Sequence, residues 1–299
     1  MRVLIAGCGD TGKRLARRHA ERGDEVIAQV RSPASGAALA GLVANRIVHD
    51  LDGNDTPGLQ LPKIDLVYIL FPPSASTVNV DEEPRTQALL AALDINSPPA
   101  RIVYISTTGV YGDAAGQWVD EQTPAAPESA RGARRWAAEN VVRRWCDAHR
   151  TEAIILRVPG IYGPGRLPLA RLRDGTPVLH EADAPWSNRI HIDDLATACL
   201  LAGTVAGACG TYNVSDGQPS TMTDYFTRLA DLAGLPRPPQ VSMAQAQRTL
   251  SENMLSFLRE SRRLDSSRIR DELGFIPRFA TLDDGLRHAL AEDAGAGAI

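Results

Sequence analysis

Short apolar runs alternate with amphipathic stretches along the first half of the chain. Each run is rich in Val, Ile and Leu and nearly continuous, which is typical of strands buried on both faces of a parallel sheet. Strand, helix and strand repeated in this order predict an α/β fold of the Rossmann type, a doubly wound parallel sheet with right-handed crossovers. The runs lie at residues 2–7, 24–30, 45–50, 65–71, 101–107 and 152–158, with a helical pattern at 131–149 before the last.

The pattern changes after about residue 160. Gly and Pro punctuate 159–185, and an apolar helix follows the acidic pair Asp193 and Asp194, one of which we expect to cap it. The remaining elements are expected as a strand and turn at 211–217 and helices at 221–233 and 241–262.

This organisation predicts two parts. Residues 1–160 should form a Rossmann-type sheet domain, to which 186–218 return. Residues 161–185 and 219–299 should form a smaller, mostly C-terminal lobe.

A glycine-rich loop directly follows the first predicted strand and opens the first predicted helix. Gly7, Gly9 and Gly12 have the G-x-G-x-x-G arrangement. In a dinucleotide fold these glycines permit the tight turn, the close approach of backbone to the pyrophosphate, and close packing of helix on strand. Because the flanking strand and helix are the expected ones, the loop predicts a nicotinamide dinucleotide site that includes Asp10 and Thr11, with ordinary turn glycines as the alternative.

The end of the second strand bears on the choice between NAD and NADP. An NAD site commonly has a carboxylate here for the ribose 2′-hydroxyl, whereas an arginine suits a 2′-phosphate. The chain has Arg31 and Ser32 at this place, so we expect NADP rather than NAD, with a solvated surface arginine as the alternative. Further cofactor contacts are expected at the ends of the next strands, from Asp50, Leu51, Phe71, Pro72 and Pro73.

Composition and charge argue against several classes of function. A net charge of −4 gives no general attraction to nucleic acid or anionic lipid. The apolar runs are shorter than the roughly 18 residues of a membrane span, and the spacing of the four cysteines suggests neither a metal site nor a disulfide scaffold. The arginine-rich segment 131–150 has apolar residues at helical spacing, which favours a packing face over nucleic-acid contact. We therefore expect a cytoplasmic protein without metal, membrane or nucleic acid.

Six stretches spread along the chain occur in a recognisable order. A strand that ends in a Ser/Thr run before a VYG turn is followed by an acidic loop, a YGPG loop and three later landmarks. They lie at 104–113, 120–124, 156–165, 188–196, 211–220 and 271–277. Together they resemble the short-chain dehydrogenase/reductase superfamily, in its extended, sugar-nucleotide epimerase/dehydratase-like branch, over nearly the whole chain.

The resemblance implies roles for individual residues. Thr107, four residues before the tyrosine of the VYG turn, takes the place of the Ser/Thr that polarises the substrate. The catalytic tyrosine and lysine of the superfamily are expected where this chain has Arg131 and Arg135. No tyrosine has a lysine four residues later, and Lys13 and Lys63 are the only lysines. The chain therefore resembles the atypical members, which keep the fold but not the Tyr–Lys pair.

Other groups must then exchange protons if the chain is an enzyme. A guanidinium stays protonated and has no acceptor, so Arg131 cannot do this, although Arg135 could hold the nicotinamide ribose. Tyr111 is one candidate, because a nearby Arg131 or Arg135 would favour its ionised form. Tyr162, after the sixth strand, and Asp81, early in the helix after the fourth, are the others. Packing roles for the two tyrosines are the alternative.

The resemblance also completes the expected binding sites and the function. It implies that the sheet domain binds the dinucleotide and that the smaller lobe binds the substrate. Ser106 and Pro159 should contact the cofactor, and Tyr111, Arg131, Tyr162 and Arg166 the substrate. We expect an NADP-preferring epimerase, dehydratase or reductase for a small polar substrate such as a sugar nucleotide. Because the Tyr–Lys pair is missing, a non-catalytic NADP sensor is the alternative. Helices near 82–93 and 131–149 are expected to form a homodimer surface.

Overall fold

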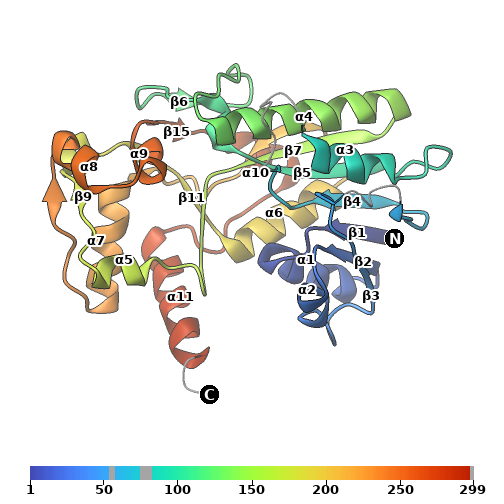
Figure 1. Cartoon of the computed structure of the whole chain (residues 1–299), viewed down its shortest axis with the longest axis horizontal. Helices are drawn as coiled ribbons and strands as arrows, with labels where there is room; N and C mark the ends of the chain where they lie inside the picture. The colour runs from blue at the N-terminus through green and yellow to red at the C-terminus, as the bar shows by residue number, and fades with distance from the viewer. Residues whose placement is uncertain (54–57, 75–82, 297–299) are drawn as a thin grey trace.

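The computed structural model describes residues 1–53, 58–74 and 83–296. Its larger part is a seven-stranded sheet in the order β12-β7-β5-β4-β1-β2-β3, with each strand parallel to its neighbours (Figure 1). The strands are β1 (Arg2–Ala6), β2 (Glu25–Val30), β3 (Asn45–Val48), β4 (Leu66–Ile69), β5 (Arg101–Thr107), β7 (Glu152–Val158) and β12 (Gly210–Asn213). This is the predicted Rossmann-type sheet.

Helices cover both faces of this sheet. α3 (Pro84–Ala91) and α4 (Ala130–His149) pack on the upper face in Figure 1, while α1 (Asp10–Glu21) and α6 (Ile192–Thr204) pack together on the lower one. Because side chains of both faces are buried, the strand sequences are apolar at successive positions. Two shorter helices belong to this part, α2 (Pro33–Ala37) and α10 (Ser267–Leu273).

A smaller region lies to the left of the sheet in Figure 1 and has its own hydrophobic clusters, one of them around Tyr162, Phe226 and Leu286. Its helices are α5 (Leu169–Arg173), α7 (Met222–Ala233), α8 (Met243–Thr249), α9 (Glu252–Leu258) and α11 (Leu282–Ala296). The short strands form pairs outside the seven-stranded sheet: β8 (Gly160–Tyr162) with β11 (Arg189–His191), β9 (Val178–Leu179) with β14 (Gln240–Val241), β10 (Trp186–Ser187) with β13 (Ser220–Thr221), and β6 (Trp118–Val119) with β15 (Arg263–Leu264).

The predicted helix over 241–262 is interrupted. Leu250 has extended backbone, and the Ser251 hydroxyl oxygen accepts the N–H of Met254 to begin α9. A serine whose side chain bonds the backbone three residues on is a helix start rather than an interior residue, which the apolar periodicity alone does not reveal. The interruption lets the segment after α9 turn back toward the sheet.

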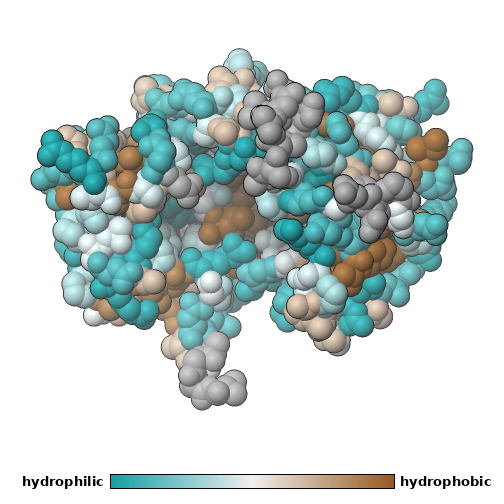
Figure 2. All heavy atoms as spheres, viewed as in Figure 1, coloured by the Kyte–Doolittle hydropathy of each residue, from teal (hydrophilic) through white to brown (hydrophobic). Residues whose placement is uncertain are grey.

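The face of the molecule shown in Figure 2 is largely hydrophilic, with hydrophobic residues in separate patches, one of which lies between the sheet region and the smaller region. Among the described residues, no helix combines the length and apolar composition needed to cross a membrane.

Candidate functional site

The glycine loop is a tight turn held against the end of β4. Gly7 has a φ of 77°, and a Cβ on it would lie 2.7 Å from the backbone nitrogen of Phe71. The N–H groups of Gly7 and Cys8 both donate to the carbonyl of Gln29, each at 3.1 Å. At Gly12 an added Cβ would lie 3.1 Å from Cys8 Sγ. The first and third glycines are therefore required by the turn and by close packing.

Helix α1 begins in this loop. Its N-cap residue is Gly9, which has no side chain that could occupy the first N–H groups of the helix. These groups and the helix dipole favour an anion such as a pyrophosphate. The loop thus has the features that a dinucleotide phosphate needs.

A cavity of about 420 Å³ lies in front of the glycine loop, at the carboxyl ends of β1 to β4. The strand order reverses between β1 and β4, and this switch point is where open α/β sheets bind their ligands. The wall includes ten residues predicted for the cofactor: Gly7, Gly9, Asp10, Thr11, Gly12, Arg31, Asp50, Leu51, Phe71 and Pro72. We call this the cofactor cavity.

Arg31 lies at the rim of the cofactor cavity, just past the end of β2. Its side chain is 71% exposed, and its Nε donates to Asp50 Oδ2 at 3.1 Å. Ser32 lies outside the wall, because its hydroxyl oxygen accepts the N–H of Ser35 and begins α2. Ser35, which the sequence did not single out, lines the cavity instead. Arg31 is thus an exposed cation at the strand end where dinucleotide folds recognise the 2′ position.

Gln29 is a polar residue of the cofactor cavity that sequence reasoning missed. It is buried, its Oε1 accepts the N–H of Gly7 at 3.1 Å, and its Nε2 donates to the carbonyl of His49 at 2.7 Å. The side chain therefore fastens the glycine loop to β2 and to the end of β3. A lone polar residue inside an apolar strand is the signal that could have identified it.

Arg85, at the start of α3, was also missed. Its Nη1 donates to the carbonyl of Pro72 at 2.5 Å, and its guanidinium pairs with Asp52. The hydrogen bond from Arg85 lowers the pKa of the Asp52 carboxyl. The sequence around Arg85 did not indicate a site residue, because its partners Asp52 and Pro72 come from other segments of the chain.

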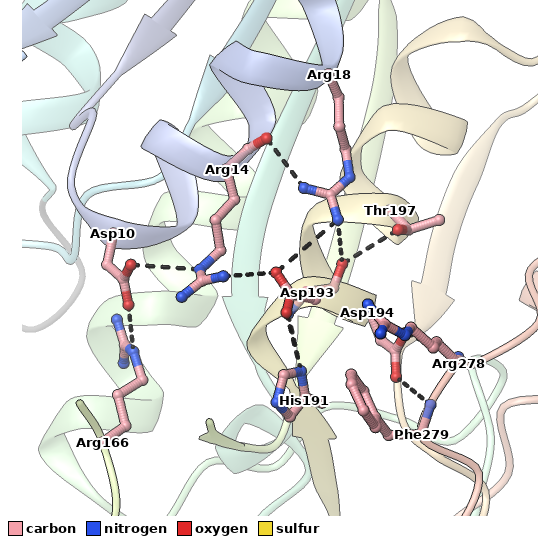
Figure 3. Close-up of polar contacts among 10 residues, drawn as sticks. All are labelled: Asp10, Arg14, Arg18, Arg166, His191, Asp193, Asp194, Thr197, Arg278 and Phe279. Atoms are coloured by element: carbon pink, nitrogen blue, oxygen red, sulfur yellow. Dashed lines mark hydrogen bonds and ion pairs between the residues drawn. The ribbon is translucent and has the colours of Figure 1, made fainter. Parts of the chain in front are cut away.

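Ion pairs connect the glycine loop to the start of α6 (Figure 3). Asp10 Oδ2 accepts from Arg166 Nε at 2.9 Å, and Asp10 Oδ1 lies 3.4 Å from Arg14 Nε. Arg14 in turn donates to Asp193 Oδ1 at 2.6 Å, and Arg18 donates to the carbonyl of Asp193 at 3.1 Å. Arg166, which we predicted for the substrate, therefore lines the cofactor cavity and ties its loop to α1.

The cap of α6 differs from the prediction. The N-cap residue is His191, whose Nδ1 accepts the N–H of Asp193 at 3.2 Å. Asp194 instead accepts the backbone N–H groups of Arg278 and Phe279, at 2.8 and 3.0 Å, and so holds the C-terminal segment (Figure 3). Burial lowers the pKa of His191 to about 4, so the ring is neutral near pH 7 and can accept this bond.

A second cavity, of about 270 Å³, lies between the end of β5 and the smaller region; we call it the substrate cavity. Thr107 comes from the end of β5, Arg131 from the first turn of α4, and Glu260 and Arg262 from the segment after α9. Pro159, predicted for the cofactor, lies here instead. The rest of the wall is formed by Thr108, Gly109, Gly160, Trp186, Ser187, Asn188, Arg189, Met222 and Phe257.

The wall of the substrate cavity contains a hydroxyl, that of Thr107, and a carboxylate, that of Glu260, which could exchange protons with a substrate. Thr107 Oγ1 accepts the N–H of Gly109 at 3.2 Å, so its own hydrogen can be donated elsewhere. Glu260 is 8% exposed, and its Oε2 accepts from Arg262 Nη2 at 2.7 Å. Its Oε1 is buried without a hydrogen-bond partner among the described residues. Such an orphaned acceptor is costly and calls for a ligand donor.

Tyr111 lies outside the walls of both cavities. Its hydroxyl donates to Asn213 Oδ1 at 2.7 Å, and its ring faces Arg157, whose Cζ lies 4.6 Å from the ring centre. Burial raises the pKa of Tyr111 to about 12 in spite of this guanidinium. The expectation that Arg131 or Arg135 would favour its ionised form is therefore wrong, because the neighbour is a different arginine and burial outweighs it.

The side chains of Arg135 and Ser106 form hydrogen bonds within the protein and line neither cavity. Arg135 Nη1 donates to the carbonyl of Ile105 at 2.8 Å and lies within hydrogen-bond distance of the Tyr104 hydroxyl and the Phe71 carbonyl. Arg135 thus joins the ends of β4 and β5. The buried Ser106 hydroxyl donates to Glu139 Oε1 at 2.5 Å, so any cofactor contact from Ser106 would come from its backbone.

Tyr162 and Asp81 complete the predicted set. Tyr162 is 2% exposed, packs among apolar side chains, and lines a hollow of about 210 Å³. This hollow shares Arg166 with the wall of the cofactor cavity and Arg189 with the wall of the substrate cavity. Burial raises the pKa of Tyr162, which disfavours acid–base work near neutral pH. Asp81 lies outside the described residues. Pro73 lies outside the walls of the cofactor cavity, the substrate cavity and this hollow.

The sequence model of the NAD dependent epimerase/dehydratase family matches residues 3–215. The chain belongs to this family. The match includes the glycine loop, Thr107, Arg131 and Arg189, and it confirms the resemblance seen in the sequence at the level of the epimerase/dehydratase family.

Relatives in this family cover nearly the whole chain. The dTDP-6-deoxy-L-talose 4-dehydrogenase (NAD(P)(+)) of Kitasatospora kifunensis is 26% identical over 95% of this chain and 93% of that protein. Protein YeeZ of Escherichia coli K12 is 27% identical over 92% of this chain and 94% of its own. A functionally unknown conserved protein from Silicibacter pomeroyi is 30% identical, with a TM-score of 0.82 over 99% of both chains. The UDP-glucose 4-epimerase of Thermotoga maritima, solved with UDP-glucose, has a TM-score of 0.80 over 99% of both chains at 19% identity, which shows the fold alone.

Proposed function

We propose that this protein is an NADP-preferring oxidoreductase or epimerase for a small polar substrate such as a sugar nucleotide. The observation that carries the proposal is the arrangement of the two cavities. The hollow beside Tyr162 shares Arg166 with the wall of the cofactor cavity at the glycine loop and Arg189 with the wall of the substrate cavity at Thr107. The dehydrogenase from Kitasatospora kifunensis, whose name includes NAD(P)(+), supports a redox function.

The residues of the cofactor cavity fit a nicotinamide dinucleotide. The close approach of Gly7 to Phe71 and the glycine N-cap of α1 leave backbone exposed for a pyrophosphate. Arg31 would bind the 2′-phosphate of NADP, and Asp50 and Leu51 would border the adenine end. When bound, the nicotinamide supplies or accepts the hydride.

Proton exchange in this proposal is carried by Glu260 in place of the missing tyrosine. Its Oε1 accepts the proton of a substrate hydroxyl, while Thr107 donates a hydrogen bond to the oxygen of that hydroxyl. Arg262 holds Oε2 and keeps the carboxylate in place. Tyr111 is a weaker candidate, because its buried hydroxyl is committed to Asn213.

The test is a Glu260→Gln variant, which keeps an oxygen for Arg262 but cannot take up a proton. We expect kcat on any active substrate to fall roughly 100-fold or more, with NADPH affinity unchanged. Glu252→Gln is the matched control, since Glu252 is exposed on α9 and pairs with Arg259. Equal turnover in Glu260→Gln and wild type would exclude this role.

A non-catalytic NADP sensor is the second candidate function. It is favoured by Arg131 and Arg135, which stand where the superfamily has its tyrosine and lysine, and by the commitment of Arg135 to backbone carbonyls. NADPH binding without turnover on a broad panel of sugar nucleotides and carbonyl compounds, together with tolerance of Thr107→Ala, would establish the sensor instead.

A further inference from the structure

Among the described residues, no anion forms an ion pair with Arg131 in the substrate cavity, although Glu260 in the same wall acts on it electrostatically. Within the described residues its guanidinium makes no hydrogen bond and no ion pair, and its Cζ lies 4.0 Å from the centre of the Phe257 ring. Burial lowers the pKa of Arg131, which shows that its surroundings stabilise the positive charge poorly. A partly buried cation of this kind is stabilised when a ligand supplies the anion.

Arg189, in β11, is a second such cation in the same wall. It is 7% exposed, its Cζ lies 4.0 Å from the centre of the Tyr225 ring, and its Nη2 faces Met222 Sδ at 3.8 Å. Its buried Nε has no hydrogen-bond partner in the part of the chain that the structure describes. Asp216 acts on Arg189 electrostatically, but burial raises the pKa of Asp216 to about 7, so this carboxyl is only partly ionised near neutral pH.

The remaining charged groups of the cavity neutralise each other. Arg262 donates to Glu260 Oε2 at 2.7 Å and to the carbonyl of Gly112. The charged residues in the wall are Arg131, Arg189, Arg262 and Glu260, so three positive charges and one negative charge leave an excess of two positive charges.

We propose that Arg131 and Arg189 bind an oxyanion of the substrate, a phosphate or a carboxylate group, so that the substrate is a sugar phosphate or a sugar acid. This inference rests on the proposed function, because it names the substrate class of the same cavity. A guanidinium presents parallel N–H donors that match both oxyanions, and the rings of Phe257 and Tyr225 each lie against one of the two cations.

The other groups of the cavity then recognise the hydroxyl part of the substrate. Glu260 would repel an anion but accepts from a hydroxyl, and Thr107 can donate to one. A volume of about 270 Å³ lies just below the range of drug-sized ligand pockets, about 300–1,000 Å³. The cavity therefore suits one sugar ring with its own anionic group, and the arginine at position 131 holds that group where the superfamily places a tyrosine.

Calorimetric titration of the full chain tests the proposal without measuring turnover. The probes are glucose 6-phosphate, glucuronate and glucose, each added to protein saturated with NADP so that phosphate cannot occupy the glycine loop. We expect at least one anionic probe to bind and glucose to bind at least tenfold more weakly, and the fluorescence of Trp186 in the cavity wall to report the same event. Whichever of the two anionic probes binds more tightly identifies the oxyanion as phosphate or carboxylate.

Substitutions locate the binding. Arg131→Gln should weaken the anionic probe roughly 10- to 100-fold, as expected for loss of a charge-assisted bidentate contact, and leave glucose unchanged. Arg131→Lys, which keeps the charge but loses the fork, should fall between. Arg144→Gln is the control, because Arg144 is exposed on the same helix and the net charge changes equally. If Arg189→Gln unfolds the protein, the Arg131 series still decides the question.

The outcomes separate this inference from the proposed function. Equal binding of glucose and its anionic derivatives, or equal effects of Arg131→Gln and Arg144→Gln, would overturn the oxyanion site even if NADPH binds. Failure to bind NADPH would overturn the proposed function, while the difference between wild type and Arg131→Gln in the glucose 6-phosphate and glucuronate titrations would still test the oxyanion site.

Discussion

Arg31 Nε lies 3.1 Å from Asp50 Oδ2 at the rim of the cofactor cavity, where the neighbouring strands β2 and β3 end. The Arg31 side chain is 71% and the Asp50 side chain 42% exposed, so the pair itself contributes little to stability. Its importance lies in binding, because the guanidinium can exchange the carboxylate for a phosphate, and the carboxylate would repel that phosphate.

Replacing Arg31 should separate the two cofactors. We predict that Arg31→Ala weakens NADPH binding roughly 10- to 100-fold, because a charge-assisted hydrogen bond is lost, and leaves NADH binding nearly unchanged. Fluorescence titration of both reduced cofactors measures this directly.

The matched variant Asp50→Asn should act in the opposite direction. Removing the exposed carboxylate frees Arg31 and is expected to strengthen NADPH binding roughly 2- to 5-fold, with a smaller effect on NADH. Equal changes in NADPH and NADH affinity in either variant would mean that these residues shape the cavity without contacting the 2′-phosphate.

Arg166 should affect both cofactors alike. It is bound to Asp10 in the glycine loop and lines the cofactor cavity, so its charge lies near the part that NADPH and NADH share. We predict that Arg166→Ala weakens both roughly tenfold, the value of one lost charge-assisted contact. Arg173→Ala, on the exposed end of α5, is the control and should change neither. A selective loss of NADPH would assign Arg166 rather than Arg31 to the 2′-phosphate.

Alanine variants of two glycines with nearly the same φ can distinguish the effect of backbone strain from that of steric overlap. Gly7 has a φ of 77° and Gly23 a φ of 78°, but an added Cβ meets Phe71 at Gly7 and no atom within 4 Å at Gly23. We predict that Gly23→Ala costs about 1–2 kcal/mol of unfolding free energy and spares cofactor binding. Gly7→Ala should cost more and abolish detectable NADPH binding. Chemical denaturation and titration of both variants measure these effects, and normal NADPH affinity in Gly7→Ala would contradict the role of the turn.

The buried His191 predicts how stability depends on pH. Burial lowers its folded-state pKa to about 4, below the unfolded value of 6.5, so the unfolded chain takes up the proton first. The neutral ring therefore contributes fully to the free energy of unfolding above about pH 7. As the pH falls from about 6.5 toward 4, about 3 kcal/mol of this free energy is lost.

A His191→Asn variant keeps an N-cap acceptor for α6 and should flatten this part of the pH dependence. His180→Asn, at an exposed histidine, is the control and should follow wild type. Denaturation midpoints from about pH 7 to pH 4 give the comparison. A wild-type slope that persists in His191→Asn would assign the acid sensitivity to other groups.

The fold and the cofactor cavity could be predicted because their signals are local. Continuous apolar runs indicate strands buried on both faces, and the glycine spacing carries the requirements of one turn and one helix start. The wall of the cofactor cavity comes mostly from residues next to these strand ends. Arg166 was assigned to the substrate because its ion pair with Asp10 joins segments far apart in the sequence.

The substrate cavity shows why the rest could not be predicted. Glu260 and Arg262 come from the segment after α9 and Arg189 from β11, and no shared spacing connects them with Thr107. The error at Tyr111 has a related cause, because its burial and its contact with Arg157 depend on how β7 and β12 pack beside it. Family landmarks locate a residue along the chain but do not report its accessibility.

The most direct test of the central claim is the titration of wild-type protein with NADPH and NADH at low and moderate salt. The account predicts that NADPH binds more tightly, and that its advantage shrinks as salt screens the exposed Arg31. Tighter binding of NADH would contradict the assignment of Arg31, and binding of neither would contradict the cofactor cavity itself.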